Sequence, residues 1–200
     1  MKKLLVFVFF LFTIALSAQS DTAIVFLGSI DSTIVTDVRY ATTNNFTGKV
    51  LYPTAKVYLR KVVAENLSKV NSYLLKNFNL RLKVFDGYRP LSVQKKMWVI
   101  LPNEDYVANP AKGSRHNRGA AVDVALIDSL GNELDMGTGF DDFSKIAYTG
   151  NMDLPADVLL NRKILHESMA KFGFDPIKTE WWHFDFKGWS RFSILDVEIK

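Results

Sequence analysis

The 200-residue sequence contains no cysteine, and this absence removes two classes of chemistry. Without thiols the chain forms no disulfide, and it has neither a cysteine nucleophile nor a cysteine metal ligand. Long apolar runs are also missing after residue 16, so we expect no stable membrane insertion by the rest of the chain. Stability must therefore come from an apolar core, with a bound metal as a further contribution.

A strong charge imbalance is absent as well. The 25 Lys and Arg residues exceed the 21 Asp and Glu residues by four, and setting aside Lys2 and Lys3 lowers the net charge to +2. No basic run stands out, so we expect no nucleic-acid partner. Repeats, low-complexity segments and Pro/Gly/Ser-rich linkers are missing too, which indicates a single domain.

The N-terminus is the one strongly apolar segment. Lys2 and Lys3 precede an almost unbroken apolar run from Leu4 to Leu16, and small residues follow it. This three-part layout predicts a secretory signal peptide over residues 1–18. The alternative is an uncleaved anchor, but the run is shorter than the ~20 residues that span a membrane. We therefore expect an exported, periplasmic protein whose mature domain covers residues 19–200.

Hydrophobic periodicity predicts an α+β domain. Apolar residues recur at three- and four-residue steps over 57–78, which indicates the longest helix. Further helices are expected over 92–99 and 158–172, and strands over 31–40, 80–86, 120–127 and 180–186. Residues 41–50 and 128–157 are rich in turn-forming residues and predict loops. This order favours a central antiparallel sheet flanked by helices over regular βαβ alternation.

His116 and Asp123 stand at the two ends of a segment of small residues, SRHNRGAAVD, at positions 114–123. In a strand over 120–127, Asp123 shares its face with two alanines, whose methyl groups leave room beside the carboxylate. An acid in the middle of a strand is costly to bury unless it is paired or bound to a cation. Gly119 permits a turn that returns His116 over the same face. An ordinary polar edge strand is an equally good interpretation of this segment alone.

The stretch EWWH, residues 180–183, adds a second histidine with an acid nearby. Two histidines and one aspartate suit Zn²⁺, because three protein ligands leave a fourth position for water or substrate. A carboxylate outside the ligand set would take a proton from water at the metal, and Glu180 is the candidate. In a regular strand Glu180 and His183 point to opposite faces. We therefore expect Glu180 to lie ahead of the strand or beside a bulge.

Two further residues stand in less specific settings. Arg89 follows an expected strand in DGYRP, and a fixed guanidinium there would stabilise the oxyanion that forms during amide hydrolysis. A solvated turn arginine is the alternative interpretation. His166, the remaining histidine, lies among charged residues of the last expected helix, which predicts a solvated helix face rather than a metal ligand.

Together these motifs resemble the D-alanyl-D-alanine dipeptidases of the VanX type, which are zinc peptidases of the D-Ala-D-Ala peptidase and Hedgehog fold group. SRHNRGAAVD matches the pattern S-x-H-x-x-G-x-A-x-D, and EWWH matches E-x-W-H. The stretches DVRYATTNNFTG, FDGYRP and DMGTGFDDF are similar as well. All occur in the family's order and cover nearly the whole mature chain.

The resemblance implies one zinc ion per chain and a catalytic pair beside it. The implied zinc ligands are His116, Asp123 and His183. Glu180 would be the general base, and Arg89 would steady the transition state. The implied reaction is hydrolysis of the dipeptide D-Ala-D-Ala to two D-alanines by a metal-bound water, without an acyl-enzyme.

The same resemblance implies substrate contacts from Ser114, Tyr40 and Asp141, the last near the free ammonium group. Two other functions stay open: a D,D-carboxypeptidase or endopeptidase acting on longer peptidoglycan peptides, and a non-catalytic, zinc-stabilised wall-binding module. An ammonium-binding acid favours the free dipeptide, and a purely structural metal would need neither Glu180 nor Arg89. The expected leader departs from the cytoplasmic resistance enzymes of the family and favours a role in cell-wall turnover.

Overall fold

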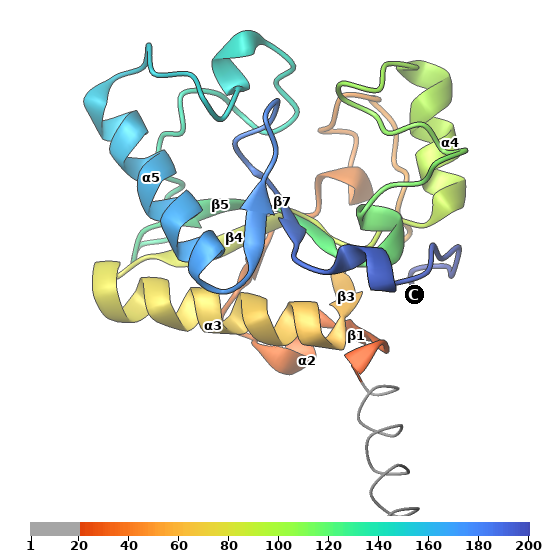
Figure 1. Cartoon of the computed structure of the whole chain (residues 1–200), viewed down its shortest axis with the longest axis horizontal. Coiled ribbons are helices and arrows are strands. Elements are labelled where there is room, and N and C mark those ends of the chain that lie inside the picture. Colours follow the sequence, from red (N-terminus) through yellow and green to blue (C-terminus); the bar gives the residue numbers. More distant parts are fainter. Residues whose placement is uncertain (1–20) are drawn as a thin grey trace, which may run out of the picture.

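The computed structural model describes residues 21–200, so the signal peptide expected over 1–18 lies outside the described residues (Figure 1). A five-stranded sheet forms the framework, in the order β2-β4-β5-β7-β6. Its strands are β2 (Val35–Thr36), β4 (Arg81–Asp86), β5 (Ala121–Ile127), β6 (Phe174–Pro176) and β7 (His183–Phe186). Neighbouring strands are antiparallel, except that β2 at the edge runs parallel to β4. The predicted α+β class is confirmed, with one parallel edge strand added.

The helices surround this sheet, and a two-stranded ribbon lies beside it. The helices are α2 (Leu27–Ile30), α3 (Lys61–Phe78), α4 (Leu91–Ile100) and α5 (Ala156–Lys171), and the ribbon pairs β1 (Ile24–Phe26) with β3 (Tyr58–Arg60). Figure 1 shows α3 below the sheet, with α5 to the left of β7 and α4 to its right; the lower end of α5 reaches α3, which it contacts. Long loops rise around β7 between α5 and α4, and they surround the site described below.

The long helix α3 begins at Lys61, four residues after the position that the periodicity predicts. The reason is tertiary: Tyr58–Arg60 pairs with β1 as a strand, and this pairing takes the backbone groups that a helix would use. The helix ends at Asn79, whose φ of 56° is the left-handed conformation of a C-terminal cap. Its buried face matches the predicted stripe and includes Val63, Leu67, Val70 and Leu74.

The prediction of a strand over residues 31–40 is mostly wrong. Only Val35–Thr36 forms a strand, and residues Arg39–Ala41 form a short 3-10 helix that carries Tyr40 into the interior. Burial of the Tyr40 ring stabilises the fold more than two or three further residues of an edge strand would. The other predicted elements appear close to their expected bounds, as α4, α5, β4 and β5, and the two predicted loops are confirmed.

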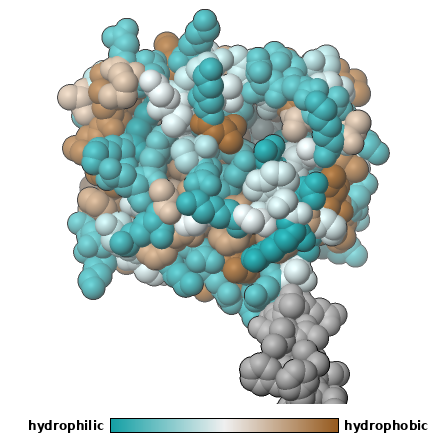
Figure 2. Space-filling model, viewed as in Figure 1, coloured by the Kyte–Doolittle hydropathy of each residue, from teal (hydrophilic) through white to brown (hydrophobic). Residues whose placement is uncertain are grey.

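Strand β5 forms the centre of the core, because all seven of its residues are buried. It lies between β4 and β7, so both of its edges are paired, and its burial shows that both faces of the sheet are covered at this point. The face seen in Figure 2 is mostly hydrophilic, with hydrophobic groups scattered over it. Within residues 21–200, none of the helices combines the length and the apolar character needed to cross a membrane.

Candidate metal centre and active site

The register of the sheet brings acids and a histidine from three strands together. Asp123 on β5 lies opposite His183 on β7, and on its other side it lies opposite Asp86 on β4. The register between β4 and β5 shifts just before Asp86, which indicates a bulge. Because cross-strand partners project from the same face, these three side chains converge above the middle of the sheet.

His116 reaches this face from a 3-10 helix, η2 (His116–Arg118), that precedes β5. Gly119 ends this helix with a φ of +66°, and a Cβ there would lie 2.7 Å from the Ile24 side chain. The predicted glycine turn is confirmed, since other residues would be strained here. His116 Nδ1 lies 2.7 Å from the Gly87 carbonyl oxygen, which can only accept, so Nδ1 carries the proton. Nε2 then faces Asp123 and His183 and is the nitrogen that could bind a metal ion.

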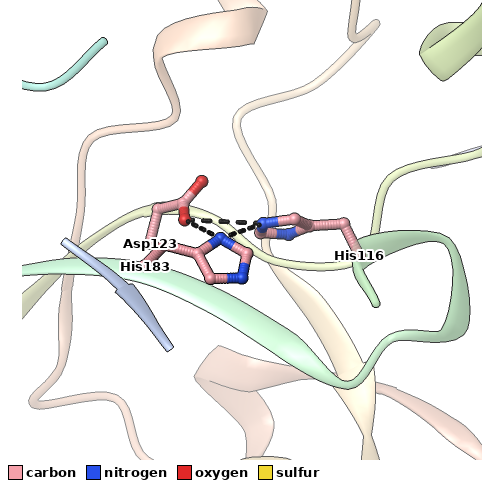
Figure 3. Close-up of side chains that lie close together, drawn as sticks. All are labelled: His116, Asp123 and His183. Carbon is pink, nitrogen blue, oxygen red and sulfur yellow. Dashed lines mark hydrogen bonds and ion pairs between the residues drawn. The ribbon is translucent and has the colours of Figure 1, made fainter. Parts of the chain in front are cut away.

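Three ligand atoms then face one another (Figure 3). Asp123 Oδ1 lies 3.4 Å from His116 Nε2 and 3.1 Å from His183 Nδ1, and the two nitrogens are 3.1 Å apart. Ligand atoms on a tetrahedral zinc ion with bonds of roughly 2.0–2.1 Å would lie about 3.3 Å from each other. Asp123 Oδ1 is buried and makes no hydrogen bond. The donor set, its spacing and this orphaned oxygen all fit a zinc ion.

The pKa shifts of Asp123 and His183 show which positive charge such an ion would replace. Burial would raise the pKa of Asp123, but His116 and His183 hold it well below its ordinary value. Burial lowers the pKa of His183, but Asp123 and Asp185 raise it to about 10. Without a metal, His183 therefore keeps a proton that shields the carboxylates. Metal binding has to displace that proton, because only a neutral imidazole is a ligand.

Asp185 supports the second histidine from behind. Its Oδ1 accepts a hydrogen bond from His183 Nε2 at 2.9 Å, which turns Nδ1 toward the metal position. Residues 183 and 185 project from the same face of β7, so strand parity was the signal for this contact. The sequence analysis did not identify Asp185.

Glu180 lies in the turn before β7, as expected, and not within the strand. Its Oε2 lies 3.8 Å from His183 Nδ1, so both residues face the same position. Burial raises the pKa of Glu180 to about 8; the charge of His183 opposes this shift, and the charges of Asp123 and Asp141 reinforce it. A buried carboxyl with a raised pKa next to a metal site has the properties of a general base.

Arg89 is buried and fixed, so the interpretation as a solvated turn arginine is wrong. Its Nε and Nη2 donate to Asp86 Oδ2 at 3.0 and 2.7 Å, and its Nη1 donates to Gln94 Oε1 at 3.0 Å. The Tyr52 hydroxyl donates to the other Asp86 oxygen at 2.8 Å. Burial lowers the pKa of Arg89, but Asp86 raises it well above the ordinary value. The result is a permanent positive charge with a fixed position.

Asp141 lines the same cavity, on the long loop after β5. It accepts hydrogen bonds from the Tyr40 hydroxyl at 3.0 Å and from the Phe46 backbone N–H at 3.4 Å. Burial raises its pKa to about 7, helped by the charge of Asp123. Its φ of 62° is unusual for a residue with a side chain, and such strain is frequent at functional positions. The neighbouring Asp142 instead accepts from the Ser144 N–H and caps a turn.

All eight residues singled out from the sequence line one cavity of about 130 Å³; they are Tyr40, Arg89, Ser114, His116, Asp123, Asp141, Glu180 and His183. Ser114 lies at its edge, where its hydroxyl oxygen accepts the Asn117 N–H at 3.1 Å. The hydroxyl proton remains available for a ligand. The structure therefore brings the predicted residues together, while their individual roles stay predictions.

Sequence comparison agrees with this geometry. A family model described as D-ala-D-ala dipeptidase, peptidase M15, matches residues 20–193. The chain belongs to this family. A D-alanyl-D-alanine dipeptidase of Escherichia coli (strain K12) is 36% identical over 168 residues, which cover 84% of this chain and 86% of that protein. One from Enterococcus faecium is 29% identical over 180 residues, which cover 80% and 89%.

A solved structure of the vancomycin resistance D,D-pentapeptidase VanY in complex with Zn(II) is also similar, at 17% identity and a TM-score of 0.44. The match covers 70% of this chain and 78% of that one. Membership of the dipeptidase family makes the protein a metallopeptidase, and the predicted enzyme class is confirmed.

His166 is the one histidine whose predicted environment is wrong. Its side chain is half-buried, and its Nε2 lies 3.1 Å from the Trp181 carbonyl oxygen. Helix α5 packs against the turn that carries Glu180, so this face of the helix is not solvated as the charge pattern suggested. His166 does not line the dipeptidase cavity.

Four partners of the site escaped the sequence analysis: Tyr52, Asp86, Gln94 and Asp185. The three-residue spacing from Asp86 to Arg89 in FDGYRP is compatible with an ion pair, and it was the available signal. No local pattern marks Tyr52 or Gln94, because only the folded chain brings them to the arginine.

Proposed function

We propose that this protein is a zinc-dependent dipeptidase that hydrolyses D-Ala-D-Ala to two D-alanines. One observation carries the proposal: the buried carboxyls of Glu180 and Asp141 and the fixed guanidinium of Arg89 line one small cavity with a cluster of three side chains that could hold a metal ion. A structural metal would need none of these additional groups. His116, Asp123 and His183 would hold the zinc ion, one per chain.

The residues around the metal position divide the chemistry among them. Bound zinc would supply polarisation of the scissile carbonyl and a lower pKa for the attacking water. Glu180, 3.8 Å from His183 Nδ1, would accept the proton of that water and later deliver it to the leaving amine. Arg89, held by Asp86, would stabilise the negative charge that develops on the carbonyl oxygen.

The charge and size of the cavity favour a free dipeptide. Asp141, oriented by the Tyr40 hydroxyl, would pair with the substrate ammonium group. A longer peptide has an amide at that position and would leave the carboxylate unpaired. A cavity of about 130 Å³ is also small beside the roughly 300–1,000 Å³ of drug-sized ligand pockets.

An aromatic wall limits the cavity further. The ring of Phe143 stands edge-on to Phe46 at 5.4 Å and stacks on Tyr106 at 4.6 Å, and all three rings line the cavity. These residues come from three separate loops, so the wall closes a gap between them. Residues preceding the dipeptide would have to pass this wall, which supports the dipeptidase over the carboxypeptidase alternative.

A role in cell-wall turnover follows from the predicted signal peptide, and we include it in the proposal. An exported enzyme would meet D-Ala-D-Ala released from the wall rather than a cytoplasmic precursor pool. Fractionation of the producing cell, with N-terminal sequencing of the mature chain, tests this part. A protein that stays in the cytoplasm with an intact N-terminus would contradict it.

The decisive experiment compares three substrates with zinc-loaded protein: D-Ala-D-Ala, its N-acetylated form and a longer peptide ending in D-Ala-D-Ala. We expect efficient hydrolysis of the free dipeptide alone. Equal hydrolysis of all three would assign the protein to the D,D-carboxypeptidases. No hydrolysis of any, with zinc bound, would favour the wall-binding module.

A further inference from the structure

The cavity has a second arginine, Arg115, whose function the proposal above leaves open. Arg115 lies between Ser114 and His116 in the chain and lines the same cavity. Its Nε lies 3.2 Å from Asp185 Oδ2, and its guanidinium carbon stands 4.5 Å from the centre of the Trp189 ring. These contacts hold one edge and one face of the guanidinium. The side chain is 45% exposed.

The far end of this guanidinium is available to a ligand. Within residues 21–200, neither Nη1 nor Nη2 of Arg115 donates a hydrogen bond, and the closest approach to Asp185 is made by Nε. These two nitrogens form the fork that binds a carboxylate with two parallel hydrogen bonds. Arg89, the other arginine of the cavity, has Nε, Nη1 and Nη2 all engaged by Asp86 and Gln94. Arg115 is therefore the cavity cation with free donors at its tip.

Asp185 ties the position of Arg115 to the metal centre. One carboxylate oxygen accepts from His183 Nε2 at 2.9 Å, and the other faces Arg115 Nε at 3.2 Å. A surface arginine that merely increases solubility would have no need of such a fixed anchor. The connection runs from the metal ligand through one carboxylate to the arginine, so the guanidinium keeps a set distance from the reacting centre.

The cavity has a negative pole at Asp141 and a positive pole at Arg115, and each is held by its own set of contacts. Asp141 belongs to the cluster of Tyr40 and Phe46, whereas Arg115 belongs to the cluster of Asp185 and Trp189 beside β7. A free dipeptide is a zwitterion with its scissile amide between an ammonium and a carboxylate. With the ammonium at Asp141 and the amide at the metal, the carboxylate projects toward the opposite pole.

We propose that Arg115 binds the C-terminal carboxylate of the substrate and so selects dipeptides with a free acid at that end. The inference rests on the proposed function, which supplies the substrate class. The Ser114 hydroxyl, next in the chain and on the same cavity wall, is a second donor for the carboxylate. Arg115 is then a specificity residue, and Asp185 positions it.

The test measures binding rather than turnover. Zinc-loaded Glu180→Ala protein, which should not consume the ligand during a titration, is compared with Glu180→Ala/Arg115→Gln by calorimetry. The ligands are D-Ala-D-Ala and its C-terminal amide, which lacks the negative charge. We expect Arg115→Gln to weaken binding of the acid by about 10–100-fold, as loss of a charge-assisted hydrogen bond does. Binding of the amide should change by less than about twofold.

Two further variants serve as controls. Arg118 stands over the same Trp189 ring, at 5.5 Å, but does not line the cavity, so Arg118→Gln removes an equal charge outside it. We expect this variant to keep the acid-to-amide affinity ratio of the parent. Arg115→Lys retains the charge without the fork and should fall between the parent and Arg115→Gln.

The outcomes separate this inference from the proposed function. Equal weakening of acid and amide binding, or no weakening of either, overturns the role of Arg115. Hydrolysis by wild-type zinc protein is measured alongside: if it is absent while Arg115 still governs acid binding, the dipeptidase proposal fails and the carboxylate site stands. Thermal unfolding of Arg115→Gln, expected within a few degrees of the parent, excludes a folding defect as the cause.

Discussion

Glu180 Oε2 lies 3.8 Å from His183 Nδ1, although the two residues would point to opposite faces of a continuous strand. The chain avoids this conflict because β7 begins only at His183. The preceding turn is anchored by Trp181, which is fully buried and donates its backbone N–H to the Ala147 carbonyl oxygen. A break in the strand is thus what lets the proposed base and the proposed metal ligand face the same point.

Replacing Glu180 with alanine should leave zinc bound while the rate of hydrolysis falls by roughly 10²–10⁴-fold, the range for loss of a general base. Metal analysis and kcat/KM on D-Ala-D-Ala check the two parts separately. Glu167→Ala is a matched control, because that side chain is 66% exposed on α5 and should affect neither quantity. An active Glu180→Ala protein would remove the base assignment.

Replacing His116 or Asp123 with alanine should reduce bound zinc from about one per chain to almost none, because a site of three ligands loses one. The measurement is the metal content after dialysis against a weak chelator. His166→Ala is the control, since this histidine bonds to the Trp181 carbonyl and should leave zinc in place. Full metal occupancy in either ligand variant would contradict the ligand set.

Arg89→Ala should depress kcat more than it raises KM, since the guanidinium is proposed to act on charge that appears only in the transition state. It should also destabilise the fold, because Asp86 would be left buried without its ion pair at a cost of about 3–5 kcal/mol. Kinetics and denaturant unfolding separate the two effects. Arg89→Lys keeps a positive charge beside Asp86, so this variant should fold and is used if Arg89→Ala does not. A change confined to KM would instead indicate ground-state binding.

Acid should weaken binding of D-Ala-D-Ala through Asp141. Burial raises the pKa of this carboxyl to about 7, so below that pH it is protonated and loses its attraction for an ammonium group. KM should therefore rise as the pH falls through 7. Bound zinc would shift this rise in KM to lower pH, because its positive charge favours the carboxylate form of Asp141. Asp141→Asn should show a high KM with a flat profile. If KM of Asp141→Asn depended on pH as it does in the parent, the rise in KM would belong to another titrating group.

The same raised pKa has a consequence for folding. Because the folded protein holds this proton more tightly than the unfolded chain, ionising Asp141 costs stability as the pH rises from about 4 to 7. Asp141→Asn removes that cost, so its free energy of unfolding should exceed that of the parent at pH 8. Urea unfolding of the metal-free proteins provides the comparison.

Phe143→Ala should open the cavity to longer peptides, because its ring joins Phe46 and Tyr106 into one wall. The ratio of kcat/KM for an N-terminally extended peptide to that for D-Ala-D-Ala should rise by about tenfold, the effect of roughly 1.4 kcal/mol of relieved exclusion. Phe78→Ala, at an exposed position on α3, is the control and should keep the parent ratio. An unchanged ratio in Phe143→Ala would show that the wall does not limit substrate length.

Much of the site could be predicted because its signals are local. Alternation along a strand places Asp123 among alanines, and Gly119 marks the turn that returns His116, so neither inference needs a distant contact. The motif EWWH likewise carries the predicted ligand and the predicted base within four residues. These features depend on bond geometry and strand periodicity, which any short segment of the chain expresses on its own.

The tertiary structure decided the rest. Asp86 meets Asp123 only because β4 and β5 pair in a shifted register, and Arg115 meets Asp185 only because β7 lies beside β5. Strand β3 replaces the first turn of the predicted helix for the same reason. Such contacts join residues 32 or more positions apart, and their energy depends on burial and pairing in the complete fold. The amino-acid order thus determines which groups are present, while long-range packing determines which of them meet.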